Sequence, residues 1–359
     1  MINVYDQLFT EDDAKAAYDV VKSGILSSFG PKTIELEDRF KKWTGRKFSL
    51  ACSNGTAALS MALCGLNVTN DRVAVPACSF AATAYAALEQ HNRVEFIDVD
   101  RSTWNMNMEK LEEACTKWLY TDPIKCVIAV HNLGNPYDYD RLSSLSHKYG
   151  FHIIEDACEA LCAKYKNKLA GSLGDISVFS FYGNKLIASG EGGMILTNME
   201  EAYNRMKLYR GQGQDFKRKF WHVARGFNFR MTNLQSAVAL SQFYRIEDIQ
   251  NKKLEIHKAY ELNIPNHVEM QLVHPECEHS WWMVGVLSKD NANYYGETSQ
   301  RLLDNRIETR PVFPPMPDMP IFRCEADIPA SRMLYRHGIL LPSGITLTEG
   351  DIKRVCSLL

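Results

Sequence analysis

A regular alternation of short apolar runs and helical patterns between residues 47 and 200 limits the possible folds most. Runs such as "DRVAVPA" and "FHIIEDA" have the length of buried strands, and segments such as "GTAALSMALCGL" between them have the composition of helices. Alternation of this kind is typical of βαβ units around a largely parallel sheet. The sequence therefore predicts an α/β fold with a large, mostly parallel sheet.

The pattern changes in the second half of the chain. A long helical stretch, "TNLQSAVALSQFYRIEDIQNKKLEIHKAYEL", leads out of the alternating region, and from about Asn263 new elements begin. There "HSWWMVGVLSK" predicts a strand, "ETSQRLLDNRI" a helix and the Pro-rich "RPVFPPMPDMP" a surface loop. We therefore expect a large domain over residues 1–250 and a smaller C-terminal α/β domain over residues 251–359.

Composition argues against several classes of partner. A formal net charge of −2 over 359 residues provides no broad basic surface for nucleic acid or anionic membranes. The N-terminus lacks the pattern of a secretion signal, and no run of about 18 apolar residues indicates a membrane span. The ten cysteines lie in apolar surroundings without a CxxC pair, which favours buried reduced thiols over disulfides or a metal site. We expect a cytoplasmic protein that binds small molecules and itself.

Three short stretches of the alternating region carry chemistry. The first, "SNGTAAL", follows a strand and opens a helix, so the N–H groups of Gly55 and Thr56 would face an anion at the positive helix end. A plain Asn-Gly turn is the alternative for this stretch. The second, "IIEDACEA", ends a buried strand with two carboxylates, Glu155 and Asp156. Either Asp156 caps a helix beside a solvated Glu155, or Asp156 meets a ring nitrogen of a cofactor and keeps it protonated.

The third stretch places Lys185 in a loop between two core strands. Apolar "ISVFSF" leads into the loop, and Gly-rich "SGEGGMILTN" leads out of it. A loop lysine is ordinarily a solvated surface charge. A lysine held between core strands and partly desolvated is instead suited to Schiff-base formation and proton transfer. The sequence therefore makes Lys185 the candidate reactive amine.

These motifs resemble those of a known family. "VFSFYGNKLIASGEGGMILTN" is similar to the Schiff-base segment of the DegT/DnrJ/EryC1/StrS sugar aminotransferases, which have the aspartate aminotransferase fold (fold type I). The likeness extends in family order through most of the chain, in "SNGTAAL", "VPACSFAATAYA", "IIEDACEA", "FWHVARGFNFRMTNLQSAVALSQ" and "RIETRPVFPP". Within the family, "FYGNK", "FWH" and "FNFRMTN" most resemble the enzymes that aminate GDP-4-keto-6-deoxymannose.

The resemblance implies roles for the residues of these motifs. Lys185 would bind pyridoxal 5′-phosphate (PLP) as a Schiff base and shuttle protons, and Asp156 would pair with the pyridinium nitrogen. The positions of three residues match phosphate contacts, namely Gly55, Thr56 and Ser180. Phe80 matches an aromatic residue stacked on the cofactor ring. Glu159 matches a position that often contacts the phenolic oxygen of the cofactor.

The resemblance also implies a homodimer with shared sites, because family members supply a phosphate contact from the neighbouring subunit through "GFNFRMTN". Asn228 matches that contact, and Arg230 is the next candidate; the alternative is that Asn228 forms a turn and Arg230 a surface ion pair. Segments that line the nucleotide-sugar cleft in relatives contain Ser28, His131, His222 and Arg310, and with Arg230 these are the five candidate substrate residues. Each of these residues alone could instead be structural. In that alternative, His131 is a polar group at a strand end and Arg310 is a loop charge. Trp281 and Trp282 would likewise be core aromatics.

The implied reaction is a two-step transamination. L-glutamate would leave its amino group on the cofactor as pyridoxamine phosphate and depart as 2-oxoglutarate, and a nucleotide-linked 4-keto-6-deoxy sugar would then take the amine. A GDP-mannose derivative is the first expectation, and a UDP- or dTDP-linked glucose derivative giving a viosamine-type sugar is the alternative. Dehydratases of the family carry histidine in place of Lys185, which argues against that branch. A non-catalytic regulator with the same fold remains a further alternative.

Overall fold

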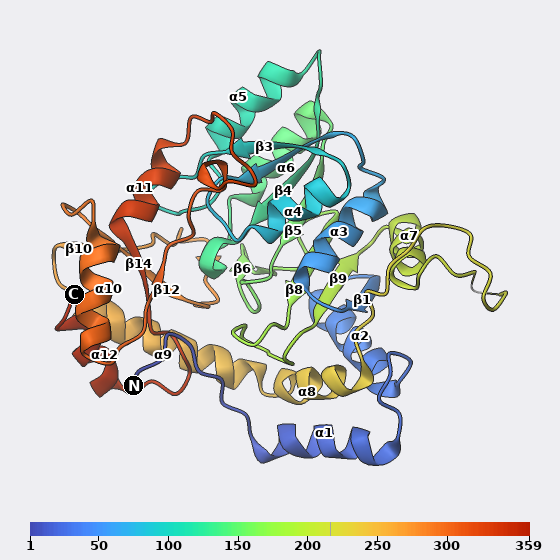
Figure 1. Cartoon of the computed structure of the whole chain (residues 1–359), viewed down its shortest axis with the longest axis horizontal. Coiled ribbons are helices and arrows are strands. Elements are labelled where there is room, and N and C mark those ends of the chain that lie inside the picture. The colour runs from blue at the N-terminus through green and yellow to red at the C-terminus, as the bar shows by residue number, and fades with distance from the viewer. Residues whose placement is uncertain (216) are drawn as a thin grey trace.

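The computed structural model describes residues 1–215 and 217–359. Its centre is a seven-stranded sheet in the order β1-β9-β8-β5-β4-β2-β3 (Figure 1). The strands are β1 (Phe48–Cys52), β2 (Arg72–Pro76), β3 (Arg93–Ile97), β4 (Ile124–Val130), β5 (His152–Asp156), β8 (Ile176–Ser180) and β9 (Gly193–Thr197). Only β9 runs against its neighbours, so six strands of this sheet point the same way. The predicted α/β fold is confirmed.

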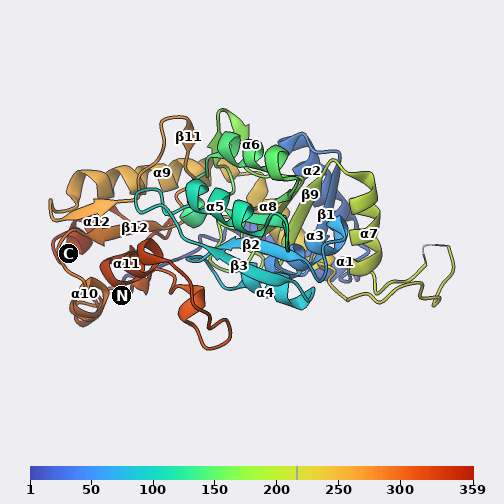
Figure 2. The same ribbon diagram turned by 90° about the horizontal axis from the view of Figure 1, so that it is seen from above.

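Helices cover both faces of this sheet, as Figure 2 shows for α5 and α6 on one side and α4 on the other. One face packs against the apolar sides of α3 (Gly55–Leu66), α4 (Ala82–Glu89) and α7 (Glu200–Arg210). The other face packs against α2 (Pro31–Thr44), α5 (Met108–Trp118), α6 (Tyr139–Tyr149) and α8 (Asn233–Phe243). Burial on both faces explains why these strands read as continuous apolar runs.

A second sheet lies in the C-terminal part of the chain, in the order β10-β12-β14-β13. Its strands are β10 (Val268–Met270), β12 (Val284–Ser288), β13 (Arg310–Pro311) and β14 (Gly338–Leu341). The helices around it are α9 (Ile246–Asn263), α10 (Tyr294–Asp304), α11 (Pro329–His337) and α12 (Glu349–Cys356). Ile2 pairs with Ile307, so the N-terminus also joins this part, and Figure 1 shows both termini on the same side.

Smaller elements complete the chain. Helix α1 (Glu11–Ser23) packs on α8, and β6 (Lys164–Tyr165), β7 (Lys168–Leu169) and β11 (Cys277–Glu278) form a small third sheet. Two short 3-10 helices are η1 (Asn132–Gly134) and η2 (Met316–Asp318). No helix among the described residues is long and apolar enough to cross a membrane.

Two predicted elements differ from the structure. The long helical stretch is divided at Tyr244 and Arg245 into α8 and α9, where the backbone of Arg245 leaves helical geometry. The strand expected from "HSWWMVGVLSK" begins only at Val284, because Trp281 adopts a left-handed φ of 56° that strand geometry excludes.

Ile249 of α9 packs with the large-sheet cluster, whereas Ile256 packs with the second sheet. Our proposed domain boundary at residue 250 falls between them.

All ten cysteines are free thiols, as predicted. The expectation that they are buried is wrong for Cys324, which is exposed on the loop before α11. Burial raises the pKa of the Cys52 and Cys78 thiols to about 12, so these side chains act as small apolar groups of the core.

Candidate active site

The predicted site residues converge because of strand direction. Strands β1, β4, β5 and β8 are parallel, so their carboxyl ends meet at one edge of the sheet. At this edge lie the start of α3 after β1, Asp156 at the end of β5 and Ser180 at the end of β8. Ligands of open α/β sheets bind outside the carboxyl ends of the strands. The edge is therefore the candidate active site.

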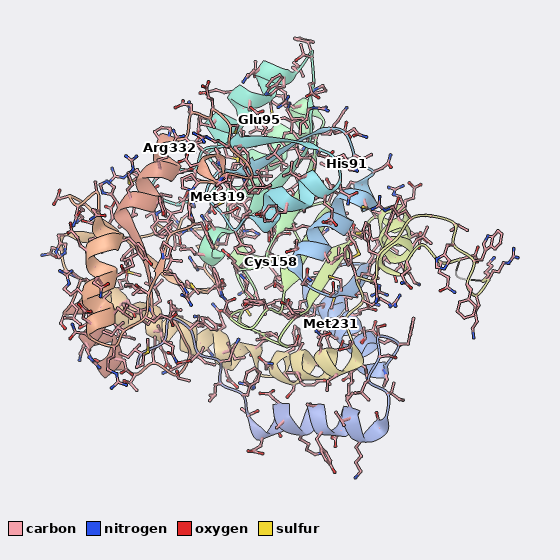
Figure 3. All side chains as sticks on the ribbon, viewed as in Figure 1. His91, Glu95, Cys158, Met231, Met319 and Arg332 are labelled. Carbon is pink, nitrogen blue, oxygen red and sulfur yellow. The ribbon has the colours of Figure 1, made fainter. Side chains whose placement is uncertain are left out.

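The N-terminus of α3 forms one wall of the site. The Asn54 side chain caps the helix by accepting a hydrogen bond from Ala57 N at 2.8 Å, which leaves the preceding N–H groups of Gly55 and Thr56 at the helix end. A Cβ at position 55 would lie 3.0 Å from both Cys158 Sγ and Ser180 Cβ. Cys158, labelled in Figure 3, therefore packs against this helix end, and a side chain at position 55 would crowd it.

Asp156 is buried, with 5% of its surface exposed. Its Oδ2 accepts a hydrogen bond from Thr83 Oγ1 at 3.1 Å, and its Oδ1 accepts one from Cys158 N at 3.1 Å. Two donors leave part of the acceptor capacity of a carboxylate unused. Asp156 can therefore accept a further hydrogen bond from a ligand.

Lys185 is held between two groups that favour its charge. Its Nζ lies 3.5 Å from Glu159 Oε1 and 3.7 Å from the centroid of the Trp282 ring. The backbone carbonyl of Lys185 accepts hydrogen bonds from Tyr5 Oη at 3.0 Å and from Gln7 Nε2. With only 13% of its side chain exposed, Lys185 differs from the solvated surface lysine that was the alternative.

Glu159 links this lysine to the adjacent strand end. Its Oε2 accepts a hydrogen bond from Leu133 N at 2.9 Å, and its side chain is only 6% exposed. Burial raises the pKa of the Glu159 carboxyl, while the positive charge of Lys185 and the Leu133 N–H group oppose that rise. Glu159 is therefore a buried carboxyl group held beside the lysine by the Leu133 N–H group.

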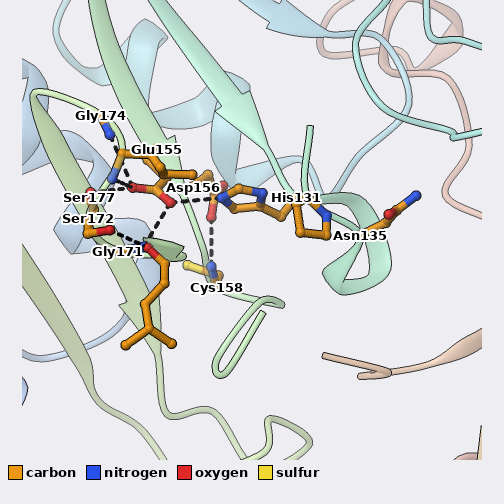
Figure 4. Close-up of polar contacts among 12 residues, drawn as sticks. His131, Asn135, Glu155, Asp156, Cys158, Gly171, Ser172, Gly174 and Ser177 are labelled. Atoms are coloured by element: carbon orange, nitrogen blue, oxygen red, sulfur yellow. Dashed lines mark hydrogen bonds and ion pairs between the residues drawn. The ribbon is translucent and has the colours of Figure 1, made fainter. Parts of the chain in front are cut away.

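Glu155 is not the solvated carboxylate that one alternative for the "IIEDACEA" motif expected. It is fully buried and accepts hydrogen bonds from His131 Nε2 at 2.9 Å and from Ser177 Oγ at 2.6 Å (Figure 4). Backbone N–H groups of Gly171, Leu173 and Gly174 complete its shell. Burial alone would raise the pKa of Glu155, but the contacts with His131 and Ser177 hold it at about 2.

His131 is consequently a buried structural residue. Its ring is fully buried, bonded to Glu155 and stacked on Tyr137 with 4.4 Å between ring centroids. This geometry matches its structural alternative, a polar group at a strand end, and it leaves no surface of the ring for a substrate. The link between His131 and Glu155 joins the ends of β4 and β5 behind the site.

The remaining predicted residues lie on exposed segments. Phe80 is 62% exposed near Phe313, and Arg310 pairs with Glu308 at 2.7 Å. Figures 1 and 2 show the segment between α7 and α8 extending away from the body of the chain. His222 on this segment bonds through Nδ1 to Gln212 O at 2.9 Å, the side chain of Asn228 is exposed, and Arg230 Nε donates to Ser28 Oγ at 3.1 Å.

The comparisons with known proteins identify a PLP-dependent transaminase of fold type I. The chain belongs to the DegT/DnrJ/EryC1/StrS aminotransferase family, whose model matches residues 7–359. Its solved relatives include an aminotransferase of this family from Brucella abortus, with a TM-score of 0.91 and 25% identity, covering 97% of this chain and 94% of that one.

Two relatives narrow the class of aminotransferase to which this chain is similar. The GDP-perosamine synthase of Escherichia coli O157:H7 is 34% identical over 357 residues, covering 99% of this chain and 96% of that protein. The GDP-perosamine synthase of Caulobacter vibrioides is 36% identical over 341 residues, covering 93% and 91%. The protein is therefore a sugar aminotransferase.

The residues at the sheet edge fit PLP. At the N-terminus of α3, Gly55 has no side chain and lies beside Ser180, so its N–H group and that of Thr56 can bind a phosphate together with the Ser180 hydroxyl. The unused acceptor capacity of Asp156 suits a protonated ring nitrogen, and Lys185 Nζ is the amine within the same site. Sequence reasoning missed the contacts of Thr83 and Cys158 with Asp156, and it gave Trp282 only as a core aromatic. The contact of Trp282 with Lys185 spans 97 positions and leaves no local signal.

Proposed function

We propose that the protein is a nucleotide-sugar 4-aminotransferase that moves the amino group of L-glutamate to a GDP-linked 4-keto-6-deoxymannose. One observation carries the proposal: the chain matches two GDP-perosamine synthases at 34% and 36% identity over almost its whole length. Transfer of the amine would give a perosamine-type sugar and 2-oxoglutarate.

The proposed mechanism assigns each site residue a task. PLP, when bound, supplies an aldehyde that carries the amino group and a ring that withdraws electrons. Asp156 keeps the ring nitrogen protonated, and the N–H groups of Gly55 and Thr56 with Ser180 bind the phosphate. Lys185 Nζ removes a proton from the amino donor and later delivers one to the sugar carbon, which predicts ping-pong kinetics. Glu159, 3.5 Å away, keeps this amine oriented.

We further propose that the enzyme works as a homodimer with shared sites. The described residues between α7 and α8 extend from the body of the chain (Figure 2). Two large apolar side chains there are exposed, Phe220 at 86% and Trp221 at 50%. Apolar groups exposed on an extended segment commonly mark a protein contact. Asn228 lies on the same segment, and we infer that it reaches the phosphate of the partner subunit.

Exposed basic groups support binding of the nucleotide diphosphate. Arg310 on β13 and His222 are exposed, Arg230 is partly exposed, and a guanidinium group can bind a diphosphate through paired charge-assisted hydrogen bonds. Ser28, which accepts a hydrogen bond from Arg230, would hold that side chain in place. Because His131 is buried against Glu155, we assign it no substrate contact.

Two alternatives keep the fold. The same reaction on a UDP- or dTDP-linked 4-keto-6-deoxyglucose would change only the loops around the nucleobase. A non-catalytic regulator would keep the cofactor or the nucleotide sugar bound without turnover. The presence of Lys185 in place of histidine separates the chain from the dehydratases of the family.

The test is an amine-transfer assay with glutamate and each of the three keto sugars, followed by chromatography of the amino sugar. We expect the GDP-linked substrate to give the highest kcat/KM, and thermal shifts with GDP, UDP and dTDP to follow the same order. Lys185→Ala is expected to lose turnover and the yellow colour of bound PLP. Faster transfer to a UDP- or dTDP-linked sugar would replace the proposed substrate, and transfer to none would favour the regulator.

A further inference from the structure

The aromatic face over Lys185 has no role in the mechanism above. Lys185 Nζ lies 3.7 Å from the centroid of the Trp282 ring, close enough for a cation–π interaction with an ammonium group. Trp282 is 4% exposed, so water does not screen this contact strongly. Glu159 Oε1, at 3.5 Å, lies beside the same amine, so a carboxyl group and an aromatic face both contact Lys185 Nζ.

The indole ring is fixed from several directions. Its Nε1–H donates to Asn184 O at 2.7 Å, on the residue directly before the lysine. The backbone carbonyl of Trp282 accepts a hydrogen bond from Lys253 Nζ at 2.8 Å. The ring therefore keeps its place relative to the lysine loop by contacts that do not involve Lys185 Nζ itself.

The backbone before Trp282 is in an unusual conformation. Trp281 has a φ of 56°, and its own ring stacks on His279 with 4.0 Å between centroids. A left-handed conformation is unfavourable for a bulky residue and persists only where surrounding contacts impose it. This turn ends the extended approach to β12 and brings the next side chain, Trp282, beneath the lysine loop.

We propose that Trp282 is a positioning residue that holds Lys185 while its amine is free of the cofactor. In a transamination cycle the lysine alternates between a state bonded to PLP and states in which pyridoxamine phosphate or no cofactor is bound. The contact seen here belongs to the free ammonium group. It therefore stabilises the states in which pyridoxamine phosphate or no cofactor is bound. Trp282 consequently favours release of the lysine when the amino group is transferred, and it keeps the amine within reach of the site.

This role makes a thermodynamic prediction that does not depend on turnover. Removing the aromatic face destabilises the free lysine, so it should tighten PLP binding relative to pyridoxamine phosphate. In Trp282→Leu, the ratio of the Kd for PLP to the Kd for pyridoxamine phosphate is expected to fall about fivefold to thirtyfold. Both constants are measured by titration of the cofactor-free protein and followed by absorbance or protein fluorescence.

Two matched variants separate the ring face from other contacts of Trp282. Trp282→Phe keeps a ring face but loses the hydrogen bond to Asn184 O, and it should keep most of the wild-type ratio. In a Lys185→Ala background, Trp282→Leu should leave the ratio unchanged because no ammonium remains. If Trp282→Leu does not fold, tetrafluorotryptophan at position 282 keeps the shape and the N–H group while removing the negative ring face.

Three results would overturn the proposal. An unchanged ratio in Trp282→Leu would show that the ring does not stabilise the free lysine. Equal changes in the Phe and Leu variants would assign the effect to the Asn184 hydrogen bond. A change that persists without the Lys185 amine would assign it to general packing of the second sheet against the site.

Discussion

Glu155 and Asp156 are consecutive carboxylates at the end of β5, yet they differ in how far their oxygens are satisfied. Glu155 receives hydrogen bonds from His131, from Ser177 and from three backbone N–H groups, and it is fully buried. Asp156 faces the other side of the strand and accepts hydrogen bonds from Thr83 Oγ1 and Cys158 N, with acceptor capacity left over. Strand alternation sends neighbouring side chains to opposite faces. Glu155, whose oxygens accept a full set of hydrogen bonds, is therefore the structural carboxylate. Asp156, whose oxygens can accept more, is the carboxylate left for a ligand.

The largest expected effect is a loss of activity when Asp156 is replaced. Asp156→Asn keeps an oxygen for Thr83 but cannot hold a proton on the ring nitrogen of the cofactor, so kcat/KM should fall about 10³-fold. The denaturant midpoint should stay close to that of the wild type. Amine-transfer assays and urea unfolding on the same preparation measure the activity and the stability. Near-normal turnover in this variant would remove Asp156 from the mechanism.

The reverse pattern is expected for Glu155→Gln. An amide at this buried position would turn N–H groups toward the N–H groups of the 171–174 loop, so the free energy of unfolding should fall by about 3 kcal/mol. Activity per folded molecule should stay within about tenfold of wild type, since Glu155 does not face the site. Urea titration measures the loss, with the exposed Glu349→Gln as a matched control. A fully stable but inactive Glu155→Gln would invert the comparison.

The pH dependence of stability sharpens the structural role of Glu155. Its pKa is about 2 in the folded protein against an ordinary 4.5, so the folded state prefers the ionised form. The resulting stability is fully present above about pH 4.5 and is lost as the pH falls toward 2. The difference in unfolding free energy between wild type and Glu155→Gln should therefore shrink over this range. A difference that stays constant down to the acid limit would argue against a paired carboxylate.

Lys253 offers a third buried charge, one that contacts carbonyl oxygens of Trp282 and Ser343. Burial lowers its pKa to about 7 from 10.5, so between these values the unfolded chain binds more protons than the folded protein. Stability from this group therefore rises with pH across that window, by about 1.4 kcal/mol per pH unit. Unfolding measured at pH 7, 8 and 9 should show this slope in wild type relative to Lys253→Met. Parallel curves for the two proteins would contradict the shift.

The smallest effect concerns the support of Asp156. Thr83→Val removes the hydroxyl that donates to Asp156 Oδ2 at 3.1 Å while keeping the volume of the side chain. Loss of one such hydrogen bond is worth about 1 kcal/mol, so kcat/KM should fall about fivefold. Thr83→Ser, which keeps the hydroxyl, is the matched control and should stay near wild type. Equal losses in both variants would point to packing rather than to the hydrogen bond.

Much of this architecture was predictable because local patterns specify it. The apolar runs of β2 and β5 and the helix after "SNG" follow from the pattern of each segment, and parallel strands then bring Gly55, Asp156 and Ser180 to one edge. The state of Glu155 was not predictable, because its donors come from the 171–174 loop and from His131 on another strand. The contact of Trp282 with Lys185 was missed for the same reason, since it depends on how the second sheet packs against the first.

The most direct test of the account asks which amine binds the cofactor. The protein is incubated with PLP, treated with borohydride to make the bond permanent, digested and analysed by mass spectrometry. We predict one modified peptide, with the pyridoxyl group on Lys185, and no such peptide from Lys185→Ala. Modification of another lysine, or none after the protein has turned yellow, would contradict the central claim.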